Sequence, residues 1–283
     1  MNKKLLKSVL LILSLYILFM IVPNVVKASE DTLNSIIMEI NLDKNGTAKI
    51  VEKWDIDVNS GTELYKQYNN LENSTIGNFN VSENGNRFQT LSAWNPGALK
   101  ADKDNKCGIN QTNAGVELCW GIGNFGRHEY VLEYEIENFI YEYDDSQISN
   151  FILVPDMVDL APKYVKITMS SFYKFDNNNL KVKLSGFNGN SNINSNGAIE
   201  IYSLGTLKAG DYVNTDFTFL DDKYSLINKT VSLDLSTVKK SNPIPKKIFV
   251  TLSGVFVLFI IANSVEERNR KKQEAIENNE ETK

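Results

Sequence analysis

The sequence has little of the chemistry that most enzymes and metal sites require. It holds a single histidine, His128, and only two cysteines, Cys107 and Cys119, among 283 residues. A Ser-His-Asp triad and a zinc site of the usual composition both need histidine or cysteine in defined sets, and a single histidine supports neither. We therefore predict no catalytic residue, no metal ligand and no cofactor, and we expect the protein not to be an enzyme.

Positive charge is scarce in the middle of the chain. Of 30 basic and 35 acidic residues in all, 13 basic and 6 acidic residues lie in segments 1–28 and 239–283, which leaves residues 29–238 with a net charge of −12. A domain this acidic repels phosphate backbones and anionic head groups. We expect no nucleic-acid partner.

Long apolar runs are missing from residues 29–247 but lie on both sides of them. Residues 9–22 are apolar, follow three lysines, and precede Pro23 and a small-residue site that ends at Ala28. This is the pattern of a signal peptide over residues 1–28, cleaved after Ala28. The alternative is an uncleaved anchor over residues 5–26.

The second apolar run predicts a transmembrane helix. Residues 248–262 carry no charge, and the run reaches 18 residues when it is extended to Val265. A buried core helix is the alternative, but core helices are usually apolar on one face only. Together the two runs predict a single-pass protein of the cell membrane. Residues 29–238 then form an extracellular domain, 239–247 a proline-stiffened stalk, 248–265 the helix and 266–283 a cytoplasmic tail.

The exported part alternates apolar and polar residues with the period of β-strands. We expect strands near residues 36–42, 48–58, 129–138, 164–172, 180–187, 198–204, 211–220 and 230–238, a long hairpin loop at 188–197, and short helices at 63–68 and 151–159. The alternation changes phase after Asn138, which suggests a bulge or a switch between sheets. The predicted fold class is mainly β: an antiparallel β-sandwich ectodomain, or two small sandwiches in series with a boundary near residue 176, plus one C-terminal transmembrane helix.

The two cysteines lie symmetrically about Asn113 in the predicted exported part. An even number of cysteines in an oxidising compartment favours a disulfide. We predict a Cys107–Cys119 bridge across one hairpin, which would stabilise the fold by roughly 3 kcal/mol in the chain-entropy model.

Three further residues are candidates for binding or for buried polar roles. Glu52 shares a strand face with apolar neighbours, so its carboxylate needs a partner, and Arg87 and Arg127 are the only arginines of the exported part. Three interpretations of Glu52 stay open: a binding or acid–base carboxylate, a glutamate that reaches solvent at a strand edge, and a buried structural ion pair. Trp94 lies at a turn, where an exposed indole would stack on a sugar or anchor a protein.

Three stretches resemble a known family. They are NGTAKIVEKWDI at residues 45–56, WGIGNFGRHEYVLEYEI at 120–136, and residues 145–167. These resemble conserved stretches of the YciQ-like membrane proteins of bacteria, and together they cover roughly residues 35–170. The resemblance implies an extracytoplasmic β domain tethered to the membrane, and it transfers no catalytic residue. The chain departs from that family's usual pattern, because it has one predicted C-terminal helix and a charged end instead of further helices and a glycine-rich tail.

The expected function is that of a non-enzymatic interaction or structural module at the cell envelope, with a protein or an envelope polymer as its partner. Two alternatives remain at this point. One is a glycan or cell-wall hydrolase that acts through carboxylates, and the other is an accessory subunit of a membrane transporter or secretion complex.

Overall fold

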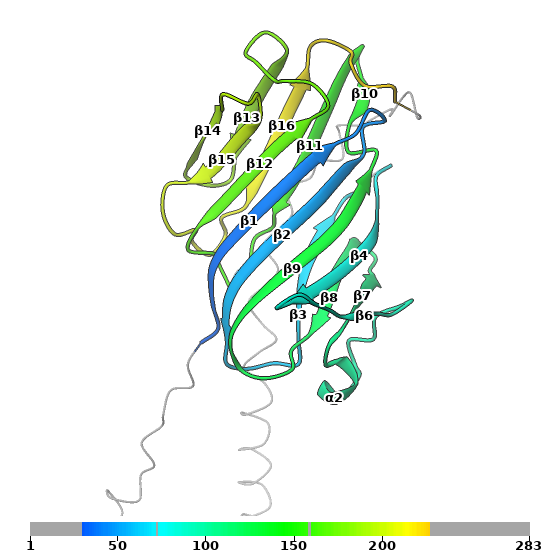
Figure 1. Ribbon diagram of the computed structural model, residues 1–283, viewed down its shortest axis with the longest axis vertical. Coiled ribbons are helices and arrows are strands. Elements are labelled where there is room, and N and C mark those ends of the chain that lie inside the picture. The colour runs from blue at the N-terminus through cyan, green and yellow to red at the C-terminus, as the bar shows by residue number, and fades with distance from the viewer. Residues whose placement is uncertain (1–29, 72, 158–159, 227–283) are drawn as a thin grey trace, which may run out of the picture. The chain divides into compact units, whose positions relative to one another are not determined.

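One large mixed sheet organises the protein in the computed structural model, which describes residues 30–71, 73–157 and 160–226 (Figure 1). The sheet has eight strands in the order β14-β15-β12-β1-β2-β9-β4-β5. Their bounds are β1 Thr32–Leu42, β2 Ala48–Val58, β4 Thr75–Glu83, β5 Asn86–Arg87, β9 Gly126–Glu137, β12 Val165–Ser171, β14 Gly189–Ile193 and β15 Ile199–Ser203.

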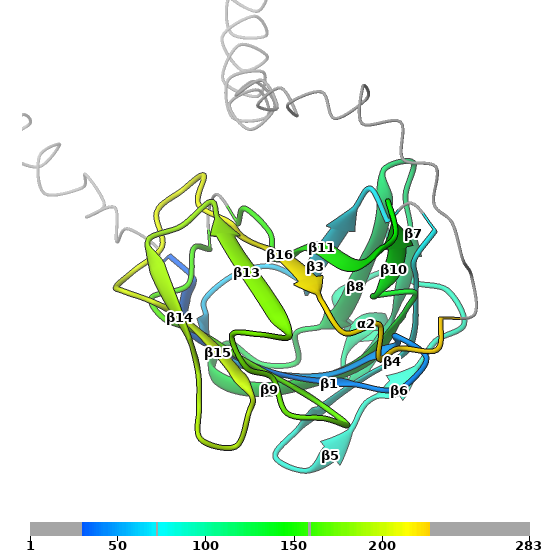
Figure 2. The same cartoon turned by 90° about the horizontal axis from the view of Figure 1, so that it is seen from above.

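Two smaller sheets of four strands each cover the same side of the large sheet, as Figure 2 shows. The first, in the order β3-β8-β7-β6, contains β3 Glu63–Asn69, β6 Gln89–Thr90, β7 Lys106–Gln111 and β8 Gly115–Gly121. The second, in the order β10-β11-β16-β13, contains β10 Tyr141–Tyr143, β11 Ser146–Val154, β13 Leu180–Ser185 and β16 Val213–Phe219. A one-turn helix, α2 Lys100–Lys103, precedes β7.

The core lies between the large sheet and the two smaller ones. Every second residue of β2 is buried from Ala48 to Val58, and β9 follows the same pattern from His128 to Ile136. This alternation arises because successive side chains of a strand point to opposite faces. Trp54 of β2 meets Trp120 of β8 edge to face, with ring centroids 5.1 Å apart, so aromatic rings fill the space between these two sheets.

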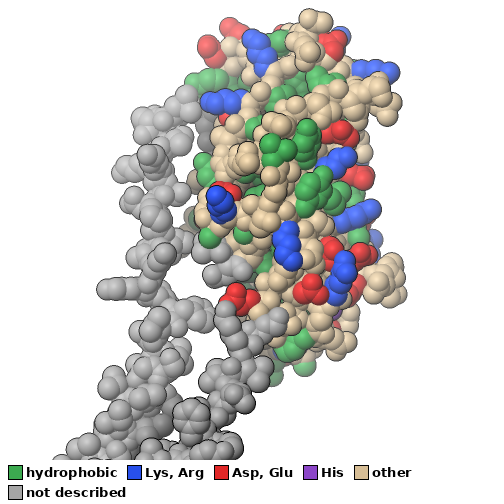
Figure 3. Space-filling view, turned by 90° about the vertical axis from the view of Figure 1, so that its left-hand side faces the viewer, with side chains coloured by type: hydrophobic (Ala, Val, Ile, Leu, Met, Phe, Trp, Pro, Cys, Tyr) green, Lys and Arg blue, Asp and Glu red, His purple; other side chains and the backbone are tan. Residues whose placement is uncertain are grey.

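The opposite face of the large sheet is polar. Its central strands present lysines and acidic residues to solvent, and Lys49 of β2 forms an ion pair with Glu135 of β9. The flank drawn in Figure 3 likewise shows basic and acidic side chains interspersed, with small groups of hydrophobic side chains among them. Glu129, Glu133, Glu135 and Glu137 of β9 lie on this face, and solvation explains such a row of glutamates without a bound ligand.

The predicted fold class needs correction. The described residues form three sheets instead of the two of a sandwich, and the large sheet is mixed because β1 pairs in parallel with β12, for example Ile36 with Val165. Alternation of apolar residues shows which face of a strand is buried, but it does not show whether the neighbouring strand is parallel or antiparallel. Within the described ranges no helix is long and apolar enough to cross a membrane. The structure therefore does not show the transmembrane helix of the predicted fold class.

Several local predictions can be compared with the structure. The sheet switch at Asn138 is confirmed, because β9 ends at Glu137, Asn138 has a φ of 53°, and the next strand, β10, belongs to another sheet. The two predicted helices are wrong: residues 63–68 lie in β3, and residues 151–154, which begin the predicted helix at 151–159, lie in β11. The predicted loop at 188–197 contains the strand β14.

Other predictions concern residues outside the described ranges. They are the signal peptide at 1–28, the strand at 230–238, the stalk at 239–247, the helix at 248–265 and the tail at 266–283. As for the boundary near residue 176, strands from both sides of it share the eight-stranded sheet, since β15 pairs with β12.

Candidate functional site

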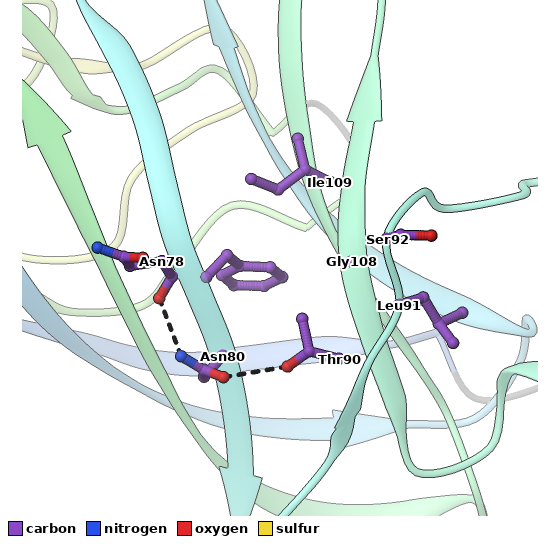
Figure 4. Close-up of a pocket in the computed structure, with 8 residues that line it drawn as sticks. Asn78, Asn80, Thr90, Leu91, Ser92, Gly108 and Ile109 are labelled. Carbon is purple, nitrogen blue, oxygen red and sulfur yellow. Dashed lines mark hydrogen bonds between the residues drawn. The ribbon is translucent and has the colours of Figure 1, made fainter.

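An open pocket lies where the edge of the large sheet meets the edge of the β3-β8-β7-β6 sheet. We call it the seam pocket. Its volume is about 330 Å³, and its lining comes from β4, β6, β7 and the segment after β6 (Figure 4). The lining residues are Asn78, Phe79, Asn80, Thr90, Leu91, Ser92, Gly108 and Ile109.

A bulge in β4 shapes one wall of the seam pocket. The pairing of β4 with β9 shifts register between Gly77 and Asn80. Asn78, inside the bulge, has a φ of 53°, a conformation that asparagine tolerates better than most residues. Its side-chain amide donates to Glu135 Oε2 at 2.7 Å, which ties the bulge to the outer face of β9.

Asn80 is the centre of the hydrogen bonds in the seam pocket. Its Nδ2 donates to the backbone oxygen of Asn78 at 2.9 Å, and its Oδ1 accepts from Thr90 Oγ1 at 3.0 Å (Figure 4). The same Oδ1 accepts from Arg87 Nε at 3.1 Å. These bonds connect β4 to β5 and β6, so Asn80 links the edges of two sheets.

The lining of the seam pocket contains no ionisable side chain. It offers amide and hydroxyl groups from Asn78, Asn80, Thr90 and Ser92 beside apolar side chains. Such a lining can hold an uncharged polar ligand by hydrogen bonds and apolar contact, but it supplies no general acid or base.

A second pocket, of about 590 Å³, lies near the last described residues. It is lined by Glu142, Asp145, Gln147, Asp222, Tyr224, Ser225 and Leu226. Three carboxylates make its lining acidic. Nevertheless, among the described residues no group of three or more His, Cys, Asp or Glu side chains is arranged to hold a metal ion.

The structure identifies Glu52 as part of a buried ion pair. The side chains of Glu52 on β2 and Lys66 on β3 are both fully buried, and Lys66 Nζ lies 2.6 Å from Glu52 Oε2. Trp54 Nε1 donates to Glu52 Oε1 at 2.7 Å, and the Tyr134 hydroxyl donates to Oε2 at 2.8 Å. Tyr68 completes this group through a 2.7 Å bond between its hydroxyl and that of Tyr134. We call these five residues the buried charge cluster.

The buried charge cluster joins two sheets. Glu52, Trp54 and Tyr134 lie on the large sheet, whereas Lys66 and Tyr68 lie on β3, which belongs to the sheet that covers it. The Lys66 ammonium also faces the ring of Tyr68, at 5.0 Å from its centroid. Because all five side chains are buried, this cluster is a structural connection and not an accessible binding site.

Charge and burial raise the pKa values of three members of the cluster, Lys66, Tyr68 and Tyr134. Burial lowers the pKa of the Lys66 ammonium, but the negative charge of Glu52 and the contact with Tyr68 outweigh this effect and raise it above its usual value. Burial, together with the negative charge of Glu52, raises the pKa of the Tyr134 hydroxyl well above its usual value, and burial also raises that of Tyr68.

We therefore expect the protein to lose stability in alkali. The unfolded chain releases protons from tyrosine and lysine near pH 10 to 10.4, while the folded cluster still holds them. The contribution of these groups to the free energy of unfolding is then constant below about pH 10 and falls as the pH rises toward their folded pKa values. Urea midpoints measured from pH 7 to pH 11 check this. A midpoint that does not change across that range would contradict the assignment.

The predicted disulfide is not formed. Cys107 and Cys119 are both free and buried. The register places Cys107 opposite Trp120 and Cys119 opposite Gly108, so the two thiols project from opposite faces of the β7–β8 hairpin. Burial raises the pKa of both thiols, which lowers their reactivity.

Two other candidates line neither pocket. Arg127 does not reach Glu52. It binds Asp55 through two hydrogen bonds, of 2.9 and 2.8 Å, on the polar outer face, and its guanidinium lowers the pKa of Asp55. Trp94 is only 5% exposed instead of open to solvent, and its indole N–H donates to Glu63. The expectation of an exposed Trp94 is therefore wrong.

His128 lies near the start of β9. It is buried, and its ring stacks on Tyr130 with centroids 5.1 Å apart. Its Nδ1 lies 2.7 Å from Glu83 Oε1, and its Nε2 lies 3.0 Å from the backbone oxygen of Asn124. Both ring nitrogens thus have protein partners, which is the arrangement of a structural histidine.

The sequence matches no family model and no curated protein. Solved structures similar to this chain include a candidate protease from Parabacteroides distasonis, with a TM-score of 0.40 and 14% identity over 68% of this chain and 41% of that chain. A candidate nutrient-binding protein from Legionella pneumophila has a TM-score of 0.40 and 10% identity over 68% of both chains. Yeast leukotriene A4 hydrolase in complex with bestatin has a TM-score of 0.43 and 9% identity over 69% of this chain and 31% of that chain.

This chain spans less than half the length of the protease and the hydrolase. These neighbours include peptidases, but with every TM-score below 0.5 the likeness assigns no activity to this chain. The resemblance to the YciQ-like membrane proteins stays a prediction.

Proposed function

We propose that the protein is a non-enzymatic interaction module of the cell envelope that binds an uncharged, hydroxyl-rich polymer through the seam pocket. The observation that carries this proposal is the lining of that pocket, where amide and hydroxyl groups lie beside apolar side chains with no ionisable group among them. Hydroxyl groups of a sugar pair well with asparagine and threonine side chains.

Electrostatics supports an uncharged partner over an anionic one. Residues 29–238 carry a net charge of −12, which disfavours phosphate-rich or carboxylate-rich polymers. An extracytoplasmic location is proposed on the pattern of residues 1–28, which is typical of a signal peptide.

The test is binding of purified protein to neutral and anionic cell-wall polysaccharides, measured by affinity electrophoresis. We expect retardation by a neutral polymer only. Asn80→Ala and Thr90→Val each remove a hydrogen-bonding group of the pocket, and each should weaken binding up to about tenfold. Asn190→Ala, on the exposed face of β14, is the matched control and should bind like the unmodified protein.

Two results would contradict the proposal. One is equal binding by the pocket variants and the control, and the other is a preference for anionic polymers. Release of new reducing ends from the polymer would instead favour the carboxylate-based hydrolase. The acidic second pocket would then be the candidate active site.

A further inference from the structure

Four Asn-Gly pairs occur in the described residues: Asn45-Gly46, Asn84-Gly85, Asn188-Gly189 and Asn196-Gly197. Asparagine followed by glycine is prone to spontaneous deamidation, because glycine has no side chain to hinder attack by its backbone nitrogen on the asparagine side chain. The attacking N–H must also be free of hydrogen bonds, and the side chain must have room to turn. The structure therefore decides which of the four pairs is reactive.

Three of the pairs are held by backbone hydrogen bonds or strand pairing. The Gly46 N–H donates to the backbone oxygen of Asp43 at 3.2 Å, and the Gly197 N–H donates to that of Asn194 at 2.9 Å. Gly189 lies within β14, where pairing with β15 fixes the backbone.

The fourth pair is different. Asn84 and Gly85 form the two-residue turn between β4 and β5, and both are exposed. Their φ angles are 50° and 78°, as in a type I′ turn. Among the described residues no backbone acceptor is found for the Gly85 N–H. Apart from its chain neighbours, no atom lies within 4 Å of the place where a Gly85 side chain would begin, so the turn is open around the attacking nitrogen, and the exposed Asn84 side chain borders solvent.

We propose that Asn84 is a site of spontaneous deamidation. The backbone nitrogen of Gly85 attacks Cγ of Asn84, a C–N bond forms, and the side-chain nitrogen leaves as ammonia. Water then opens the resulting succinimide ring at either carbonyl, which yields aspartate or isoaspartate. One water is consumed and one ammonia is released, and nothing is oxidised or reduced.

Modification of Asn84 would alter the seam pocket by disturbing the hairpin formed by β4 and β5. Isoaspartate adds one carbon to the backbone, which a two-residue turn cannot absorb without disturbing the Ser82–Arg87 and Glu83–Asn86 pairs. Arg87 holds Asn80 in the seam pocket. The effect on ligand binding rests on the proposed function, whereas the modification itself does not.

The experiment incubates the full chain in mildly alkaline buffer, folded or unfolded in urea, and follows each Asn-Gly pair by peptide mapping. The mass change on replacing NH2 by OH is one readout, and enzymatic methylation of isoaspartate is the second. In the folded chain Asn84 should react about tenfold faster than Asn45 or Asn196, the factor that one protecting hydrogen bond supplies. In urea the four pairs should react at similar rates.

Asn84→Gly is the matched variant, because a Gly-Gly pair keeps the type I′ turn and removes the reacting amide. It should abolish modification at the hairpin and leave the other three pairs unchanged. If Asn84 in the folded chain reacts no faster than Asn196, or if urea leaves the order of rates unaltered, the proposal is overturned.

Discussion

Replacing Lys66 with methionine should destabilise the protein by about 3–5 kcal/mol, which is the usual cost of removing one partner of a buried ion pair. The Glu52 carboxylate would keep its bonds to Trp54 and Tyr134 but lose the Lys66 ammonium that neutralises it. Urea unfolding followed by tryptophan fluorescence measures the change in the midpoint. Glu52→Gln should cost a similar amount, because it leaves the ammonium buried without a counter-charge.

The double variant distinguishes two causes of lost stability: a charge left buried without its partner, and the loss of side-chain packing. Lys66→Met combined with Glu52→Leu removes both charges, and replacing a buried pair by apolar residues is often neutral. We expect it to recover much of the stability that Lys66→Met loses. Lys49→Met is the control, since its 3.9 Å ion pair with Glu135 lies on the exposed face and should contribute little. If Lys66→Met and Lys49→Met unfold at the same urea concentration, the buried ion pair does not stabilise the contact between the two sheets.

Gly121→Ala should destabilise the fold by about 3 kcal/mol, the upper range for an overpacked site. A Cβ on Gly121 would lie 1.9 Å from the backbone oxygen of Lys103, at the end of α2. Because the obstacle is backbone and not the end of a flexible side chain, α2 would have to move away from β8. This close approach gives a physical reason for a glycine at the start of the GIGNFG stretch.

Two other glycines are matched controls for Gly121→Ala. Gly77→Ala adds a methyl group where no atom lies within 4 Å and at an ordinary φ, so it should not lower stability. Gly126→Ala also meets open space, but at a φ of 128°, so it isolates backbone strain and should have an intermediate effect. Equal urea midpoints for Gly121→Ala and Gly77→Ala would show that α2 can move away from β8 without any loss of stability, which would contradict the prediction.

Strand positions with strong alternation are predictable from sequence, and the partners of the strands are not. β2 alternates over its whole length and β9 from His128 onward, so their buried faces, and the placement of Glu52 on such a face, follow directly. The partner of Glu52 is missed because the predicted helix at residues 63–68 is in fact a strand. The signal is present in the sequence, since Leu64, Lys66 and Tyr68 alternate with polar or exposed residues at the period of a strand.

The seam pocket is not predictable from the sequence, and its origin explains why. It depends on a bulge at Asn78 and on the parallel pairing of β6 with β7. Neither feature can be recognised from the hydropathy of the sequence. The disulfide prediction fails for a related reason. Cysteine spacing suggests a hairpin, which is present, but a register one residue different from the assumed one sends the two thiols to opposite faces.

The parallel contact between β1 and β12 has a consequence for how the chain matures. Ile36 and Val165 are neighbours in space but more than a hundred residues apart in sequence, and β1 lies in the interior of the largest sheet. During synthesis, the β1–β2 hairpin can form early, but one edge of β1 stays without its partner until residues 165–171 have emerged. Proteins with such high contact order fold slowly and expose aggregation-prone edges meanwhile. The vulnerable period of this protein thus lasts until β12 has paired with β1.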